Sequence, residues 1–199
     1  MYKGDNVMNT LQDLIKKYAA QYKEQVIAWR RHIHSHPELS GQEKETSLFI
    51  QKTLGELGIP FVNDVSDYAV IGEIQGAHTG PVIALRADID ALPIHEETGL
   101  PFASQNEGVM HACGHDGHIS ILLGAAAVLQ SIKEELHGTV KLVFQPSEEE
   151  ALFPGAQGIV DSGILDDVDE IFGLHVWPQL PVGTVGLKKG HLMAASDHF

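Results

Sequence analysis

The sequence predicts an α/β fold in which helices cover both faces of a layered mixed sheet. Short apolar runs rich in Val, Ile and Leu alternate with longer amphipathic stretches, an order typical of layered α/β domains. Polar clusters directly follow several of the apolar runs, where the ligand crevice of such a sheet lies. The chain of 199 residues is 43% hydrophobic and 20% charged, an ordinary composition for a globular domain.

Two helices are expected first. Residues 8–34 form one, because apolar side chains recur at steps of three and four residues, at Leu11, Ile15, Tyr18, Tyr22, Val26 and Trp29. Pro37 should end it. The histidines at its end, His32, His34 and His36, are better explained by favourable charge at a helix C-terminus than by metal binding. A second helix fits residues 45–57, before Gly58.

Strands and two further helices follow. Strands are predicted at residues 68–74, 81–87, 140–144 and 170–174, with an edge strand starting at residues 183–187. Helices are predicted at residues 117–136 and 155–162. The small residues 124–127 should let the first of these helices pack closely on the sheet.

Three of the predicted strands end in ionisable residues. Asp88 and Asp90 occupy alternate positions and should point the same way, although a solvated strand end is the favoured explanation when they are considered alone. The adjacent carboxylates of Glu148 and Glu149 would repel each other unless a positive group lies nearby, or unless their loop is solvated. A histidine such as His175, considered alone, is usually a satisfied core residue.

The chain is organised around residues 110–118, which contain the only cysteine and three histidines. Thiolate and imidazole are preferred ligands of zinc and related metals, and Gly114 lets Cys113 and His115 face one point. The alternative is a polar loop with a buried structural cysteine. Because this loop opens a helix, it can share the sheet edge with the strand-end clusters. One crevice would then collect thiolate, imidazole and carboxylate groups, which favours a metal site.

Bulk properties exclude several classes of function. The net charge of −14 argues against a nucleic-acid surface, which would need a basic face. A single cysteine cannot form an internal disulfide and suits a reducing compartment. The N-terminus lacks the apolar core of a signal peptide, and the apolar run at residues 119–129 is too short to span a bilayer. We therefore expect a cytoplasmic protein with no nucleic-acid or membrane partner.

Five motifs follow one another along the chain: His34–Ser40, Arg86–Pro93, His111–His118, Phe144–Glu149 and Gly173–Val176. Together they resemble the dinuclear metal-dependent amidohydrolases that cleave N-acyl-L-amino acids. This family includes hippurate hydrolase and auxin-conjugate hydrolases and is related to aminoacylase and the metallo-carboxypeptidases. The resemblance implies a zinc-peptidase-like catalytic domain, a small N-acyl amino acid as substrate, and a homodimer for the full-length form.

The resemblance also implies residue roles. Two divalent ions, Zn²⁺ or Mn²⁺ with Co²⁺ or Ni²⁺ as alternatives, would be held by Cys113, His115, Glu149 and His175. Glu148 would be the catalytic acid/base, and Asp90 would orient the cluster. Asp88 stands where the wider superfamily has a metal-binding histidine, whose part His115 would take. His118 and Asp116 belong to the motif without an assigned metal-binding role.

Family members are longer than this chain. By resemblance, residues 1–190 are the N-terminal part of the catalytic domain, and residues 191–199 begin the connection to an absent lid and dimerisation domain. A last histidine ligand would lie beyond Phe199, so the chain alone is expected to be inactive. The alternatives are a dipeptidase or carboxypeptidase on the same scaffold and a non-catalytic metal-binding fragment. A closed structural site needs no spare carboxylate, whereas hydrolysis needs Glu148.

Overall fold

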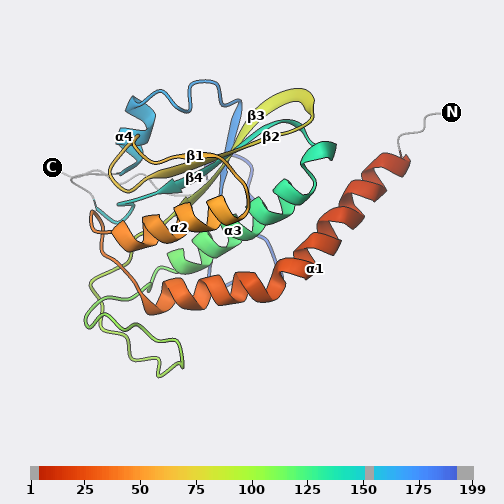
Figure 1. Ribbon diagram of the computed structural model, residues 1–199. Coiled ribbons are helices and arrows are strands. Elements are labelled where there is room, and N and C mark those ends of the chain that lie inside the picture. Colours follow the sequence, from red (N-terminus) through yellow and green to blue (C-terminus); the bar gives the residue numbers. More distant parts are fainter. Residues whose placement is uncertain (1–4, 151–154, 192–199) are drawn as a thin grey trace.

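The computed structural model describes residues 5–150 and 155–191, which form a mixed five-stranded sheet between helices (Figure 1). The sheet order is β1-β2-β4-β3-β5. Its strands are β1 (Phe61–Val62), β2 (Val70–Gln75), β3 (His78–Asp88), β4 (His137–Gln145) and β5 (Glu170–Gly173). The helices are α1 (Asp5–Ser35), α2 (Lys44–Glu56), α3 (His115–Ser131), a 3₁₀ helix (Lys133–Glu135) and α4 (Gly155–Asp161).

Apolar side chains are buried on both faces of the sheet, as the predicted fold class requires. Helices α1, α2 and α3 lie on one face, where Trp29, Leu54 and Leu123 pack with Phe144 of β4. On the other face, Ile159 of α4 packs against a smaller cluster that includes Ala84 and Val143. Figure 1 shows α4 on the side of the sheet opposite the three longer helices. The prediction of helices on both faces is confirmed.

Strand direction brings the polar clusters to one edge. β3 is parallel to both β4 and β5, with Asp88 opposite Gln145 and Arg86 opposite Gly173. The carboxyl ends of these three strands therefore meet at the same edge, where open α/β sheets form their ligand crevices. Helix α3 begins at that edge too, so the loop before it lies beside the strand ends.

Several element predictions differ from the structure. The strand predicted to start at 183–187 is wrong: this segment is irregular, and Val185 and Leu187 are exposed. The two-residue β1 was not predicted, because it is too short to show a pattern. β3 starts at His78, before the predicted residue 81, and passes Pro81 through a shift in register with β4, so only the start of the strand was missed. The helix predicted for residues 117–136 is divided between α3 and the 3₁₀ helix.

The close packing on the sheet expected for residues 124–127 holds for Ala126 and Ala127, which share the core cluster with Phe144 of β4, but Gly124 has a different neighbour. A Cβ built on Gly124 would lie 2.7 Å from Cγ2 of Val26, so this glycine faces α1 and not the sheet. Residues 192–199, most of the predicted connecting segment, lie outside the described residues. Within the described part of the chain, no helix is both long and apolar enough to cross a bilayer.

Candidate metal centre

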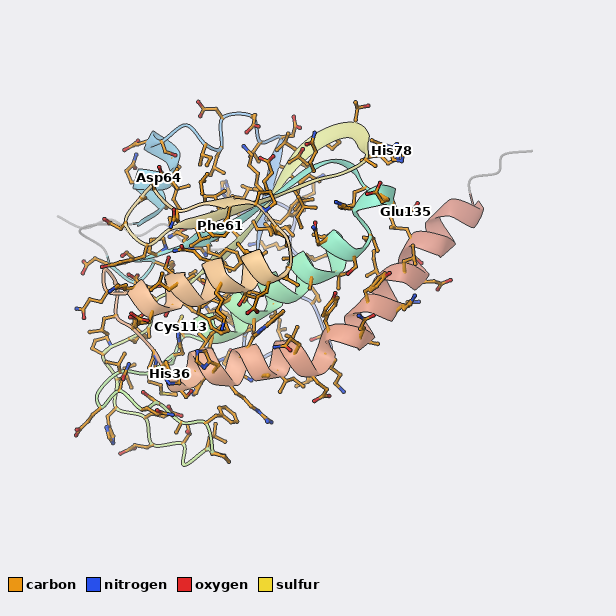
Figure 2. All side chains as sticks on the ribbon, in the orientation of Figure 1. His36, Phe61, Asp64, His78, Cys113 and Glu135 are labelled. Atoms are coloured by element: carbon orange, nitrogen blue, oxygen red, sulfur yellow. The ribbon has the colours of Figure 1, made fainter. Side chains whose placement is uncertain are left out.

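The Cys113 loop and the segment after β5 meet although they lie far apart in the sequence. Cys113 Sγ is 3.3 Å from Nε2 of His175. Gly114 makes this approach possible, since its φ of +89° is left-handed and a Cβ there would lie 2.5 Å from Cγ2 of Val176. Figure 2 shows Cys113 at the same end of the helical layer as His36, whereas His78 of β3 lies at the opposite end.

His115, the first residue of α3, lies fully buried at the centre of the cluster. Its Nδ1 lies 2.9 Å from the carbonyl oxygen of Asp90 and 3.1 Å from Oδ1 of the same residue. Its Nε2 is buried and has no hydrogen-bond partner among the residues that the structure describes. That nitrogen faces carboxylate oxygens of Asp88 at 3.6 Å and of Glu148 and Glu149 at 3.8 Å.

The electrostatics of the cluster call for a positive charge among these groups. Burial, followed by the hydrogen bond and charge of Glu149 and the charge of Glu148, raises the pKa of the Cys113 thiol to about 12. Burial and the charges of Asp88 and Glu149 also raise the pKa of Glu148. Burial opposes charge on His115, but its bond to Asp90 and the surrounding carboxylates outweigh that and raise its pKa. A cation would relieve the repulsion.

The donor atoms are suited to a divalent metal. Among the described residues, three groups have ligand atoms within 4.8 Å of one another, and all three include His115. They are Cys113 with His115 and His175, Asp88 with His115 and His118, and His115 with Glu148 and Glu149. Thiolate, imidazole and carboxylate suit zinc and related metals, and the buried Nε2 without a partner is the atom a cation would satisfy.

Asp90 connects the parts of the cluster. The residue is 1% exposed. Its Oδ2 accepts hydrogen bonds from Ser40 Oγ at 2.7 Å and from the Glu149 backbone N–H at 2.9 Å. Because Oδ1 faces His115, this one carboxylate fixes both the ring and the acidic loop. Several of these contacts lower its pKa although burial opposes them.

The structure excludes one alternative for the two aspartates and adds a site residue that the sequence analysis missed. Asp88 and Asp90 are each 1% exposed, so the alternative of a solvated strand end is wrong. Glu43 accepts a 2.7 Å hydrogen bond from the backbone N–H of Ser147, the residue before the two glutamates, whose φ is +51°. Such a contact spans more than a hundred positions and leaves no local signal in the sequence.

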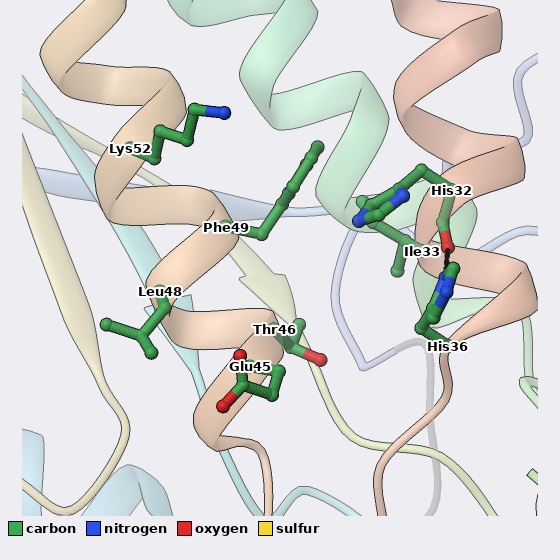
Figure 3. A pocket seen from close by; sticks show the side chains of 8 residues that line it. All are labelled: His32, Ile33, His36, Glu45, Thr46, Leu48, Phe49 and Lys52. Atoms are coloured by element: carbon green, nitrogen blue, oxygen red, sulfur yellow. Dashed lines mark hydrogen bonds between the residues drawn. The ribbon is translucent and has the colours of Figure 1, made fainter.

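The histidines at the end of α1 have structural roles, although favourable charge is not that of His32, whose pKa is lowered by burial and by the charges of His36 and Lys52. His36 Nδ1 lies 2.8 Å from the carbonyl oxygen of His32, a C-terminal cap visible in Figure 3. The His32 ring stacks on Phe49 of α2 with ring centroids 4.6 Å apart. The groove between these helices includes none of the predicted metal ligands. His34 instead lies buried between Asp116 and Glu96.

Two curated relatives match nearly the whole of this chain. The chain is 47% identical over 196 residues to an N-acetyl-L-cysteine deacetylase of Bacillus subtilis, covering 98% of this chain and 47% of that protein. It is 45% identical over 186 residues to an N-acyl-L-amino acid amidohydrolase of Geobacillus stearothermophilus, covering 93% of this chain and 50% of that protein. The chain thus spans about half the length of these curated relatives.

A solved structure and a family model both match this chain to one peptidase family. The YXEP protein of Bacillus subtilis, described as a dinuclear metal binding peptidase from the M20 family, superposes with a TM-score of 0.80 at 49% identity. The match covers 88% of this chain and 48% of that one. The model of peptidase family M20/M25/M40 matches residues 84–192, more than half of the chain, and this range contains all three groups of candidate metal ligands. The chain therefore belongs to peptidase family M20/M25/M40.

Proposed function

We propose that the described residues form most of the active site of a metal-dependent hydrolase that cleaves the amide bond of N-acyl-L-amino acids. The products would be a carboxylic acid and a free amino acid. The observation that carries the proposal is the convergence of a thiol, two imidazoles and two glutamates around the buried, unpartnered Nε2 of His115. The deacetylase and amidohydrolase relatives support this substrate class.

We assign Cys113, His115, Glu149 and His175 to the binding of two divalent ions. Zinc, manganese, cobalt and nickel all fit, because the ligand set mixes a soft thiolate with harder carboxylates. Bound divalent metal would polarise the amide carbonyl and lower the pKa of a water molecule. The dinuclear YXEP protein supports a count of two.

We assign proton transfer to Glu148. Its side chain is 40% exposed, more than the 24% of Glu149, so it can reach a substrate. Its raised pKa brings the carboxylate nearer to the pH at which it can both accept a proton from water and return it to the leaving amine. Asp90 contributes by holding His115 and the Glu149 backbone in place.

The chain covers only about half of its relatives' length, which bears on the domain organisation of the whole protein. We propose that residues 1–190 are the N-terminal part of a catalytic domain and that residues 191–199 begin the connection to a lid and dimerisation domain. The full-length enzyme would be a cytoplasmic homodimer acting on a small molecule. The half-length match to the relatives supports this division.

Peptide hydrolysis is the second candidate, since the YXEP protein is described as a peptidase. A panel of substrates distinguishes peptide hydrolysis from hydrolysis of N-acyl amino acids. A full-length form loaded with Mn²⁺, Co²⁺ or Zn²⁺ is assayed with N-acetyl and N-benzoyl amino acids and with dipeptides. We expect kcat/KM to be highest for an N-acyl amino acid. Preference for dipeptides would favour the peptidase, and no metal-dependent turnover of any substrate would refute both.

A further inference from the structure

His118 joins two parts of the site that the assigned roles leave unconnected. It lies in the first turn of α3 and is 2% exposed. Its Nδ1 is hydrogen-bonded to Oδ1 of Asp88, and its Nε2 is 3.0 Å from the backbone nitrogen of Val176. Val176 directly follows His175, so the contact lies one residue away from a proposed metal ligand.

The partners of the ring fix the direction of each hydrogen bond. A backbone N–H can only donate, so Nε2 of His118 accepts from Val176 and carries no proton itself. The proton of the neutral ring therefore lies on Nδ1 and is donated to Asp88. Nη1 of Arg86 donates to the other oxygen of Asp88 at 2.7 Å, which holds that carboxylate in place at the end of β3.

The segment that carries His175 has little other support in the described structure. β5 lies at the edge of the sheet and pairs with β3 alone. His175 is exposed, and its Nδ1 bonds to the carbonyl of Val176, which is part of the same segment. The Val176 side chain lies over Gly114, where a Cβ would come within 2.5 Å. The contact between the His175 segment and the Cys113 loop therefore depends on the position of Val176.

We propose that His118 is a positioning residue that holds Val176 and thereby aims His175 at Cys113. Arg86, Asp88 and His118 form a chain of hydrogen bonds from the end of β3 to the segment after β5. The ring of His118 also meets that of His175 edge-on, with centroids 4.8 Å apart. The inference rests on the proposed function, because it takes His175 to be a metal ligand. Groups that orient metal ligands typically change metal affinity about 10–100-fold when they are removed.

Two substitutions of His118 test its two hydrogen bonds separately. In His118→Gln, the side-chain oxygen can reach the position of Nε2 and accept from the Val176 N–H, while the bond to Asp88 is lost. In His118→Asn, the shorter amide can reach the position of Nδ1 and donate to Asp88, while the bond to Val176 is lost. If holding Val176 is what matters, His118→Gln should be the milder change. The exposed His137 at the start of β4 provides a control, His137→Asn.

The first measurement needs no metal. Hydrogen exchange of the Val176 amide is followed by NMR in the metal-free 199-residue chain. We expect protection in the wild type, His118→Gln and His137→Asn, and faster exchange in His118→Asn. Equal exchange in His118→Asn and the wild type would overturn the proposed tether.

The second measurement is Co²⁺ affinity, followed by thiolate-to-Co²⁺ absorption during competition with a chelator. We expect His118→Asn to bind Co²⁺ about 10–100-fold more weakly than the wild type and His118→Gln to lie close to the wild type. Equal losses in both variants would refute positioning through Val176. If the wild type gave no thiolate–Co²⁺ absorption, the metal assignment and the positioning role would both fail, whereas the exchange data would still report on the tether.

Discussion

Glu148 and Glu149 are neighbours with different surroundings, and this difference can be tested. The backbone of Glu149 is held by Asp90, whereas Glu148 is the more exposed and has a raised pKa. In a full-length form, Glu148→Gln should keep its metal and lose about 10²–10⁴-fold in kcat. Glu149→Gln should also lose metal, as measured by metal analysis after dialysis. Equal metal loss in the two variants would show that the roles are assigned wrongly.

His34 gives the fold a pH-dependent contribution to stability. Its hydrogen bond to Asp116 raises its pKa, with Glu96 adding to the effect and burial opposing it. Because the folded-state pKa lies above the unfolded value of about 6.5, the stabilisation is complete below that pH and fades as the pH rises through the folded pKa. His34→Gln should therefore destabilise the chain most near pH 6 and progressively less above it.

Urea unfolding of the metal-free chain between about pH 6 and pH 9 measures this difference, with His137→Gln as an exposed control. A deficit in His34→Gln that stays constant or grows with rising pH would contradict the assignment of the stabilisation to a charged His34.

At the residue scale, the sequence predicts which residues come together when metal-binding side chains lie at the ends of predicted elements. Cys113, His115 and His175 could be grouped because thiol and imidazole groups lay at predicted strand and helix ends, and the structure brings them together. The contact of His118 with Val176 and that of Glu43 with Ser147 could not be predicted. They depend on the tertiary approach of backbone groups, which residue type does not encode.

At the element scale, the contact of α1 with α3 depends on a glycine. Alanine favours a helix over glycine by about 1 kcal/mol, yet a Cβ at Gly124 would lie 2.7 Å from Val26 Cγ2. Since overpacking costs about 1–3 kcal/mol, Gly124→Ala should lower the free energy of unfolding by about 1 kcal/mol. Adding Val26→Ala should recover part of this loss in a double-mutant cycle. A more stable Gly124→Ala, with no coupling to Val26, would disprove the close contact.

The accuracy of the predicted elements follows the strength of their patterns. α1 and α2 have clear helical periodicity, and their observed bounds are close to those predicted. β4 reads as an apolar run because it is buried in the middle of the sheet. The strand predicted from Gly183 has apolar residues but no neighbouring strand in the described structure, and Val182 and Val185 are exposed. A strand needs a partner that local sequence cannot supply.

At the scale of the whole molecule, β5 and the segment after it expose apolar side chains in the described part of the chain. Exposed side chains here are Ile171, Phe172, Leu174, Trp177, Leu180 and Leu187. Exposed apolar patches promote association, and half of the relatives' length has no counterpart in this chain. We expect the 199-residue chain to self-associate and to lack ordinary turnover, about 1–10³ s⁻¹, with Mn²⁺ and an N-acetyl amino acid. Light scattering and an amine-release assay check this, and an active monomer would contradict it.

The central claim is that the converging thiol, imidazole and carboxylate groups bind divalent metal. The most direct measurement is an anomalous-scattering map recorded at the zinc absorption edge from crystals of the zinc-loaded chain. We expect a peak bonded to Cys113 Sγ and His175 Nε2, at about 2.3 Å and 2.0–2.1 Å respectively. A zinc-loaded crystal with no anomalous peak within bonding distance of Cys113, His115 or His175 would contradict the account.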